Sequence, residues 1–373
     1  MLLILAIAFG FLFLHPYITY PLSLLVFPAR RPVLQPDAAR PSATLVFCAY
    51  NEADSIPEKI ANLRQIKEIV PNIEFKAYVD LSTDDTLAIL RQHSDLIDVH
   101  GARQRTGKAL GMRHLVAEIN TDIIIFTDAN VIVEPSSVPR LLDYFSDPRI
   151  GGVCGQLIYV NPDESPTSSV SSIYWRLEEM IKRLESRSGS TMGADGSLFA
   201  TRRADYPEVP AHLLDDFTVS MSVVFAELRL VSAPDVRAYE RSAAASGDEF
   251  RRKRRIACRA YSTHRYLVPK LAGMSMLNLY KYVSHRFIRW YGAAFAALSA
   301  LFGLAWIDAS FGRLWTLGFT ILGMVAIGTA LAQRRGPGAQ IGAMLLAIVA
   351  TLLGVIDAWR GKRYQTWQPA QTR

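Results

Sequence analysis

The chain has 373 residues, half of them apolar, and a formal net charge of +7. This length allows one or two domains with a full hydrophobic core, and the basic excess lies mainly beside apolar segments, which favours an anionic membrane surface over nucleic acid as a partner. The three cysteines, Cys48, Cys154 and Cys258, are few, odd in number and far apart, which excludes a cysteine metal site and a disulfide framework and is typical of a reducing cytosol.

The first 28 residues are apolar and nearly uncharged, and Arg30 and Arg31 follow them directly. A signal peptide carries its positive charge before the apolar stretch, so this order predicts an uncleaved transmembrane anchor over residues 1–28. Pro16 and Pro21 would kink or end its helix. The two arginines are expected on the cytoplasmic side of the membrane.

Residues 42–265 alternate between strand-like and helix-like patterns. Apolar runs at 44–49, 74–79 and 123–127 are typical of strands, and apolar residues recur at helical spacing between them. Such alternation predicts an α/β domain with a mostly parallel sheet and helices on both faces. The stretch 237–247, rich in Ala and Ser, is interpreted as a mobile loop.

The run Ile123–Phe126 predicts a strand buried on both faces, and it ends in Asp128-Ala129-Asn130. Ligands of α/β sheets bind beyond the carboxyl ends of the strands, and two oxygen-bearing side chains two positions apart can face the same point there. Asp128 and Asn130 would suit a hard divalent cation such as Mg²⁺, which indicates chemistry on a diphosphate. The alternative for this motif is ordinary turn chemistry.

Other predicted strands also end in polar groups. The first ends at Tyr50-Asn51-Glu52, the second at Asp80, and the loop before the next long helix is Arg105-Thr106-Gly107-Lys108. These groups are expected along one sheet edge, with a base and ribose over the first two loops and the diphosphate and metal at Asp128.

The C-terminal third contains three apolar runs, at 291–310, 314–332 and 341–356, which predict transmembrane helices within residues 291–357. Residues 270–290 are expected to form an interfacial helix, and 358–373 a basic tail. Three crossings would place that tail outside, whereas its basic residues favour the inside. The sequence leaves this conflict open.

These residues together resemble the family 2 glycosyltransferases over most of residues 42–260. The resemblance implies a GT-A fold for a catalytic domain at 42–265, a nucleotide-sugar donor, and membrane helices like those of the polysaccharide-building branch. It also implies that Tyr50-Asn51-Glu52 opens the nucleotide site, that Asp80 accepts the uracil N–H, and that Lys108 lies near phosphate. Asp128-Ala129-Asn130 resembles the Asp-x-Asp motif that holds Mg²⁺ or Mn²⁺, with Asn130 in its last place. That amide brings no charge, so the metal should bind less tightly without the nucleotide.

Three downstream segments carry the rest of the resemblance. The stretch from Gly193 through Asp195 and Gly196 is similar to the acceptor-side loop. Asp215-Asp216 is similar to the motif that supplies the general base, which would be Asp216 with Asp215 beside it. Arg255 occupies the arginine place of Gln-x-x-Arg-Trp and would neutralise the leaving diphosphate. Ile256 replaces the tryptophan, which argues against processive polymer synthesis.

The expected function is therefore inverting transfer from a nucleotide-diphosphate donor, such as a UDP-sugar, to a lipid-linked sugar or cell-surface glycan. The protein is expected in the cell membrane as a multi-pass protein with a cytoplasmic catalytic domain, beside membrane lipids and any partner proteins of a glycan assembly pathway. One alternative is a catalytically silent scaffold that binds nucleotide or glycan, favoured by the substitutions Asn130, Arg252 and Ile256. Another, a nucleotidyltransferase, would need a glycine-rich basic loop that Asn51–Asp54 does not supply.

Overall fold

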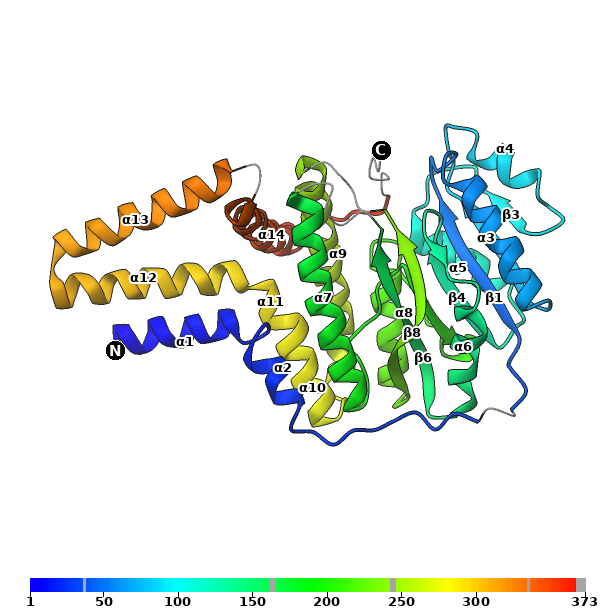
Figure 1. Ribbon diagram of the computed structural model, residues 1–373, viewed down its shortest axis with the longest axis horizontal. Helices are drawn as coiled ribbons and strands as arrows, with labels where there is room; N and C mark the ends of the chain where they lie inside the picture. The colour runs from blue at the N-terminus through cyan, green and yellow to red at the C-terminus, as the bar shows by residue number, and fades with distance from the viewer. Residues whose placement is uncertain (36–37, 161–165, 242–245, 334–335, 367–373) are drawn as a thin grey trace.

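The computed structural model describes residues 1–373 apart from 36–37, 161–165, 242–245, 334–335 and 367–373. An α/β domain carries a helical arm that contains helices from both ends of the chain (Figure 1). The strands are β1 (Ala43–Ala49), β2 (Glu74–Val79), β3 (Asp98–Gly101), β4 (Ile123–Asp128), β5 (Ile132–Val133), β6 (Ile150–Tyr159), β7 (Leu198–Arg202) and β8 (Arg229–Glu240). The helices are α1 (Leu2–Leu14), α2 (Thr19–Leu24), α3 (Ile56–Ile69), α4 (Thr86–Arg91), α5 (Lys108–Ala117), α6 (Ser137–Asp143), α7 (Pro166–Arg187), α8 (Asp215–Phe225), α9 (Ser246–Leu271), α10 (Met276–Tyr282), α11 (Ile288–Trp290), α12 (Gly292–Phe311), α13 (Arg313–Ala332) and α14 (Gly336–Trp359). Short 3₁₀ turns η1 (Tyr144–Ser146) and η2 (Arg203–Asp205) and a π-helical turn η3 (Val283–Phe287) complete them.

The strands form one sheet with the order β3-β2-β1-β4-β7-β6-β8-β5. β3, β2, β1 and β4 run parallel to one another, as expected, and β6 pairs in parallel with β8, whereas β7 runs antiparallel to both β4 and β6. The sheet is therefore mixed, and its parallel part agrees with the prediction. Because β7 is antiparallel, its first residue pairs near the end of β4, with Thr127 opposite Leu198, and the loop before β7 lies at the carboxyl edge of the parallel strands.

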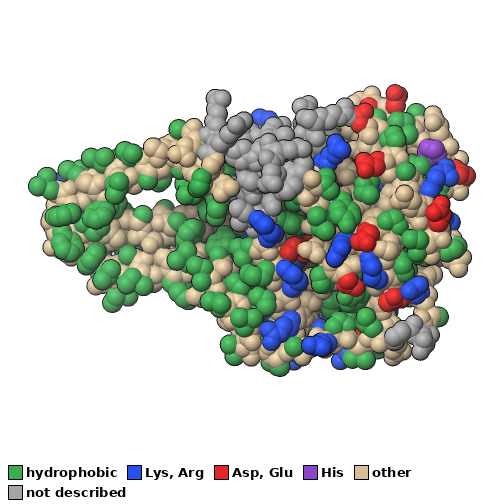
Figure 2. All heavy atoms as spheres, in the orientation of Figure 1, with side chains coloured by type: hydrophobic (Ala, Val, Ile, Leu, Met, Phe, Trp, Pro, Cys, Tyr) green, Lys and Arg blue, Asp and Glu red, His purple; other side chains and the backbone are tan. Residues whose placement is uncertain are grey.

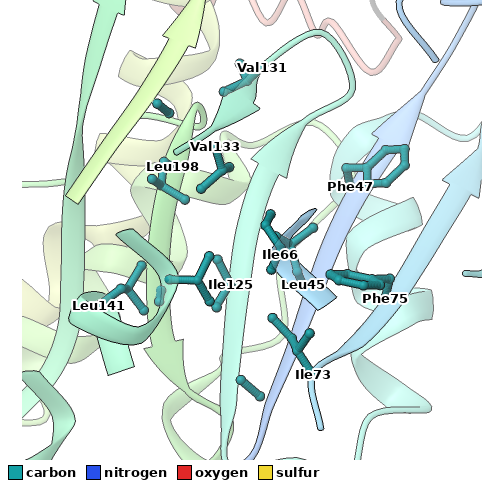
Figure 3. Close-up of a cluster of buried hydrophobic side chains, with 14 of the residues drawn as sticks. Leu45, Phe47, Ile66, Ile73, Phe75, Ile125, Val131, Val133, Leu141 and Leu198 are labelled. Atoms are coloured by element: carbon teal, nitrogen blue, oxygen red, sulfur yellow. The ribbon is translucent and has the colours of Figure 1, made fainter. Parts of the chain in front are cut away.

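Two hydrophobic cores lie on the two faces of the sheet. Alternate residues of β1 and β4 supply each face, so that Leu45 and Ile125 join one core with α3 and α6, and Val46 and Ile124 join the other with α5, α8 and α9 (Figure 3 shows the first). Burying each such side chain contributes roughly 1.5–3 kcal/mol. Helices cover both faces, as the alternating pattern predicted.

The N-terminal apolar segment does not form one long helix. α1 has 13 residues, about 20 Å, which is short of the ~20 residues that cross a bilayer, and the chain turns near Pro16 before α2. α1 packs along α12, where the ring of Phe9 stacks on Phe295 and Phe302 at centroid distances of 6.2 and 5.7 Å. In α2, Tyr20 is buried against α7. The expectation of a spanning helix at each end is therefore met only in part.

Among the described residues, α12, α13 and α14 are long and apolar enough to cross a membrane. α12 and α13 form a hairpin that projects from the α/β domain beside α1 (Figure 1), and its surface is almost wholly apolar (Figure 2). α14 differs, because 28% of its most apolar window is buried, against 0% and 6% in α12 and α13, and it packs along α9. Arg254 of α9 donates from Nε and Nη2 to the two carboxylate oxygens of Asp357 in α14, at 2.7 and 2.8 Å. The chain beyond α14 thus returns to the side of the α/β domain.

Residues 276–290 lie between the arm and the α/β domain as α10, the π turn and α11. The side chains of Lys281, Ser284 and His285 are buried against that domain. This segment therefore makes extensive contact with protein.

Candidate active site

The end of β4 is held by two lysines. Lys108 at the start of α5 donates to Oδ1 of Asp128 at 2.5 Å. Lys59 lies on the apolar face of α3 and donates to the backbone oxygens of Asp128 and Val131 at 3.1 and 2.6 Å. Burial lowers the pKa of Lys59 to about 7. The sequence analysis missed Lys59, although a lysine in line with Ile56 and Ile60 was a visible signal.

Gly196 is where the predicted metal, phosphate and base residues meet. A Cβ atom on Gly196 would lie 2.9 Å from Lys108 Nζ, 3.3 Å from Asp216 Oδ2 and 3.9 Å from Asp128 Oδ2. Any larger residue would therefore push into these three side chains. Lys108, Asp128, Gly196 and Asp216 are called the catalytic cluster below. The antiparallel β7 creates this cluster, because it delivers the loop before it to the end of β4.

Asp216 lies in the first turn of α8, next to the buried Asp215. Burial and the charge of Asp215 raise the pKa of Asp216 to about 7, although Lys108 opposes this rise. A helix N-terminus favours a carboxylate, so the motif is both a helix start and a base candidate. A carboxylate that titrates near neutrality suits proton abstraction.

Lys108 is the central cation of the cluster. Burial acts to lower the pKa of Lys108, but the carboxylates of Asp128, Asp215 and Asp216 raise it well above its ordinary value. The lysine therefore stays charged, which suits contact with phosphate oxygens.

The predicted nucleotide residues occupy the neighbouring strand ends. Asp80 is fully buried, and its carboxylate accepts from Arg105 Nε and Gly107 N at 3.0 and 3.1 Å and from Thr106 N at 2.6 Å. It thereby fixes the loop before Lys108. The Arg105 guanidinium lies 3.3 Å from the ring centroid of Tyr50.

Asn51 and Glu52 complete this edge. Asn51 has a left-handed backbone (φ 53°), and its Oδ1 accepts from Thr83 N at 2.8 Å, which joins the first two loops. Burial raises the pKa of Glu52 to about 7, with the charges of Asp128 and Glu240 adding to the rise.

Asn130 does not stand alone beside Asp128. Its Nδ2 donates to Oε1 of Glu240 at 3.1 Å, and burial together with Asp128 raises the pKa of Glu240 to about 7. The sequence analysis missed Glu240 because it placed 237–247 in a mobile loop, whereas β8 continues through residue 240. That interpretation was wrong for residues 237–240, and 242–245 lie outside the described residues.

The chemistry of these acids fits a cation. After burial, the charge of Asp128 raises the pKa of both Glu52 and Glu240, and a divalent ion between these carboxylates would relieve that repulsion. Within the described part of the chain, no three His, Cys, Asp or Glu side chains are arranged to hold a metal by themselves. Asp128 and Asn130 would therefore need further oxygens, such as those of a bound diphosphate.

Contacts with neighbouring side chains hold the predicted acceptor loop in place. Asp195 does not extend freely into a site, because its Oδ2 accepts from Lys182 Nζ at 2.6 Å and its Oδ1 from Ser197 N at 3.2 Å. Gly193 has φ +105°, and a Cβ there would lie 2.8 Å from the ring of Phe217. The loop is thus packed against the residue that follows Asp216.

α9 supplies a row of arginines beside the base. Burial, with Arg259 and Arg252 nearby, lowers the pKa of Arg255 to about 10. One turn further, Arg259 donates to the backbone oxygen of Leu213, and its charge acts on Asp216. The sequence analysis expected Arg255 here but missed Arg259.

Residues 361–366 lie over the edge of the site near Lys108. The backbone oxygen of Lys362 contacts Cys258 Sγ on α9 at 3.4 Å. A side chain on Gly107 would collide with the backbone oxygen of Gln365. This segment therefore connects α9 with the loop that binds Asp80.

Comparison with known proteins agrees with this geometry. Residues 44–209 match the model of the family described as "Glycosyl transferase family 2". A poly-beta-1,6-N-acetyl-D-glucosamine synthase of Staphylococcus aureus is 24% identical over 157 residues, which are 41% of this chain and 37% of the relative. An N-acetylglucosaminyltransferase of Azorhizobium caulinodans is 28% identical over 102 residues, or 27% of this chain and 26% of the relative. The matches thus span well under half of either curated relative.

The mannosyltransferase PcManGT of Pyrobaculum calidifontis, solved with GDP-Man and Mn²⁺, has a similar fold, with a TM-score of 0.76 at 18% identity over 97% of this chain and 100% of that one. The mixed sheet with its covering helices and polar carboxyl edge is a GT-A fold. Within it, residues 44–209 are the part that matches the family 2 glycosyltransferases.

Proposed function

We propose that this protein is an inverting glycosyltransferase that moves a sugar from a nucleoside diphosphate, a UDP-sugar first of all, to an acceptor at a membrane surface. The observation that carries the proposal is the meeting of Lys108, Asp128 and Asp216 at Gly196. A phosphate-binding cation, a metal-binding carboxylate and a carboxylate that titrates near pH 7 then share one point. Sugar transfer needs these three groups together.

The donor would lie along the carboxyl edge of β1, β2 and β4. The base would face Tyr50 and the Asp80 loop, and the diphosphate would reach Lys108 and Asp128, whose Oδ1 and Nζ atoms are 2.5 Å apart. Lys108, with Arg255 of α9, would balance the charge that grows on the leaving diphosphate. The names of the relatives and of PcManGT support N-acetylglucosamine or mannose as the first sugars to test.

A divalent cation, Mg²⁺ or Mn²⁺, fits the acidic end of β4. Asp128 and Asn130 would hold it, and the presence of Mn²⁺ with PcManGT supports this choice. When bound, it would neutralise diphosphate charge. Glu240 would orient Asn130, since Nδ2 donates to it at 3.1 Å.

Asp216 would take the proton from the acceptor hydroxyl. Asp216 lies in the first turn of α8 and, like Asp128, near Gly196, which supports a place opposite the leaving group. Attack from that side inverts the configuration at the anomeric carbon. Asp215 and burial keep the pKa of Asp216 near 7, so that the base is strong enough to act at neutral pH.

The arm supports an acceptor at the bilayer. α12 and α13, each 20 residues and about 30 Å long, would cross out and back, with α1 beside them. α14 would lie at the surface, since it packs on α9, and the tail would stay on the catalytic side. This arrangement removes the conflict between three crossings and a basic inner tail, and it supports a cytoplasmic catalytic domain.

Single-sugar transfer is favoured over polymer synthesis. Ile256, at the place of the family's tryptophan, is 40% exposed and offers no aromatic surface on which an acceptor sugar could stack. The acceptor would therefore be released after one transfer.

The test is a donor screen with purified full-length protein in liposomes made from the total lipid extract of the expression host. UDP-GlcNAc, UDP-glucose and GDP-mannose are each incubated with Mn²⁺, and release of UDP or GDP is measured. We expect release from at least one donor and its loss on chelation. Binding of a donor without any release would favour the silent scaffold.

A further inference from the structure

A buried ionic cluster joins the membrane-proximal helices to α7. His285, in the π-helical turn, is fully buried, with Nδ1 2.8 Å from Oε1 of Glu185 and Nε2 3.0 Å from Oε1 of Glu178. Arg289 donates to the other oxygen of Glu178 at 2.7 Å, and the Tyr20 hydroxyl of α2 donates to Glu185. This set is called the His285 cluster.

Both carboxylates of the cluster are ionised. Burial alone would raise the pKa of Glu185, but His285 and hydrogen bonds from Tyr20 and Met192 lower it to about 2. Burial likewise opposes ionisation of Glu178, yet His285 and Arg289 lower its pKa well below the ordinary value. A neutral imidazole donates from one nitrogen only. His285 has a carboxylate oxygen at each nitrogen and therefore bridges Glu185 and Glu178.

The cluster holds the acceptor loop directly. Oε2 of Glu185 accepts from the backbone N–H of Met192 and from Thr191 Oγ1, both at 3.0 Å. Arg286, the next residue after His285, donates from Nε to the backbone oxygen of Met192 at 2.6 Å. Its Nη2 donates to the backbone oxygen of Gly193 at 3.3 Å. The residues that lock His285 in place thus also fix the chain just before Gly196.

This connection reaches the catalytic cluster within a few residues. Gly193 packs against Phe217, which follows Asp216, and the loop then runs to Gly196 beside Lys108 and Asp128. Lys182 fixes the intervening Asp195 from α7, the helix that carries both glutamates. A shift at His285 would therefore move the loop between the membrane-proximal helices and the base.

We propose that His285 is a positioning residue for the acceptor. Buried between two glutamates, it ties α10, the π turn and α11 to α7 and so sets the Met192–Gly196 loop against Asp216. The Asp80 loop at the donor edge is held by its own hydrogen bonds, from Arg105, Thr106 and Gly107. A change at His285 is therefore expected to affect acceptor use more than nucleotide binding. This inference rests on the proposed glycosyltransferase function.

The test compares two reactions of the full-length protein, His285→Gln against wild type, with the donor that wild type uses in the screen. Transfer is measured in liposomes of the host's total lipid extract and with soluble β-1,6-linked N-acetylglucosamine oligomers. Hydrolysis is measured without acceptor. We expect transfer to fall at least 20-fold, while hydrolysis and the Kd for the nucleoside diphosphate change less than threefold.

An equal fall in transfer and hydrolysis, or no fall in either, would overturn the proposal. Wild type that releases no nucleotide from any donor would instead refute the proposed function on which it rests. His264→Gln is the matched control, because His264 is also buried but its Nδ1 is hydrogen-bonded, at 2.9 Å, to the hydroxyl of Tyr282 on α10 rather than to a carboxylate. It should keep the ratio of transfer to hydrolysis.

A double variant separates positioning from folding. In Glu178→Gln with His285→Gln, one amide can donate to Glu185 and accept from the other, so that both hydrogen bonds of position 285 are restored. We expect transfer at least fivefold above that of His285→Gln alone. A double variant no better than the single one would overturn the proposal. If His285→Gln fails to fold, Arg286→Lys, which removes the paired contacts to Met192 and Gly193, takes its place in the same comparison.

Discussion

The donor edge and the acceptor side of this site are built in different ways. The donor edge uses residues that directly follow consecutive parallel strands, such as Asp80 after β2 and Asp128 at the end of β4. The acceptor side combines a loop before an antiparallel strand, the first turn of α8, α9, and helices next to the membrane arm. Asp216 and His285, for example, act on one loop although 69 residues separate them in the chain.

The donor edge and the acceptor side should therefore respond differently to substitution. Hydrogen bonds between neighbouring strand-end loops hold the donor edge, such as those of Asn51 with Thr83 and of Asp80 with Arg105. A change there should therefore weaken nucleotide or metal binding alone. The acceptor side depends on buried ion pairs between distant segments, so changes there should uncouple transfer from binding. Variants on the two sides can break or sharpen this contrast.

The largest effect is expected from Asp216→Asn. The amide keeps the size of the side chain but cannot accept the acceptor proton, and general-base loss typically costs about 10²–10⁴ in rate. We expect transfer to fall about 10³-fold with the Kd for UDP and Mn²⁺ nearly unchanged, measured by nucleotide release and calorimetry. Near-normal turnover would remove Asp216 from the base role. Asp205→Asn, at another half-buried carboxyl with a raised pKa, is the control and should keep transfer.

The pH dependence of wild-type kcat should show the titration of Asp216. The pKa of Asp216 is raised to about 7, so its basic form is lost as pH falls through that value. We expect kcat to drop about tenfold per pH unit below about 7 and to level off above it. The pKa values of Glu52 and Glu240 are also raised to about 7, so both side chains lose their negative charge as pH falls. Metal and donor binding should then weaken, and KM should rise. A kcat that stays flat from pH 5 to 8 would contradict the assignment.

Lys108→Met tests the donor edge and the acceptor side together, because Lys108 contacts Asp128 and acts on Asp216. Methionine keeps much of the length but removes the cation that stabilises phosphate and lowers the pKa of Asp216. We expect kcat to fall about 10–100-fold, in the range typical of one lost charge-stabilising group, and the midpoint of the pH profile to move upward. Lys67→Met on α3, which donates to the backbone oxygen of Ile73, is the control. A lower rate with an unmoved midpoint would place Lys108 away from the base.

The sequence predicted the part of the fold that local patterns determine. The buried runs of β1 and β4 and the helices between them lie where periodicity put them, because both faces of these strands are covered. The antiparallel β7 was not predictable in this way, because it pairs with β4 and β6, which lie far from it in the chain. The break between α1 and α2 falls at Pro16, where the sequence predicts a kink or an end of the helix.

The residues of the site divide in the same way, into those that local motifs predict and those that depend on distant partners. Asp128, Asp216 and Lys108 were predicted from motifs and strand ends, and they lie together. Glu240 and Arg259 were missed, because each contributes through a partner distant in sequence, Asn130 and Leu213 respectively. Asp195 was predicted to bind acceptor, and its contact with Lys182 gives it a supporting position under that loop.

The smallest effect tests the donor edge alone. Asn130→Asp restores the second carboxylate of the Asp-x-Asp motif and replaces the hydrogen bond to Glu240 with repulsion that a cation would relieve. Since each added charged ligand tightens divalent cation sites, we expect the Kd for Mn²⁺ without nucleotide to fall about tenfold, measured by electron paramagnetic resonance of free Mn²⁺. With UDP bound, the gain should shrink, because the diphosphate then supplies the charge. The exposed Asn72→Asp is the control for added charge. Equal Mn²⁺ binding by the two variants would show that position 130 does not face the metal. A change in the ratio of transfer to hydrolysis in Asn130→Asp would contradict the separation of the donor edge from the acceptor side.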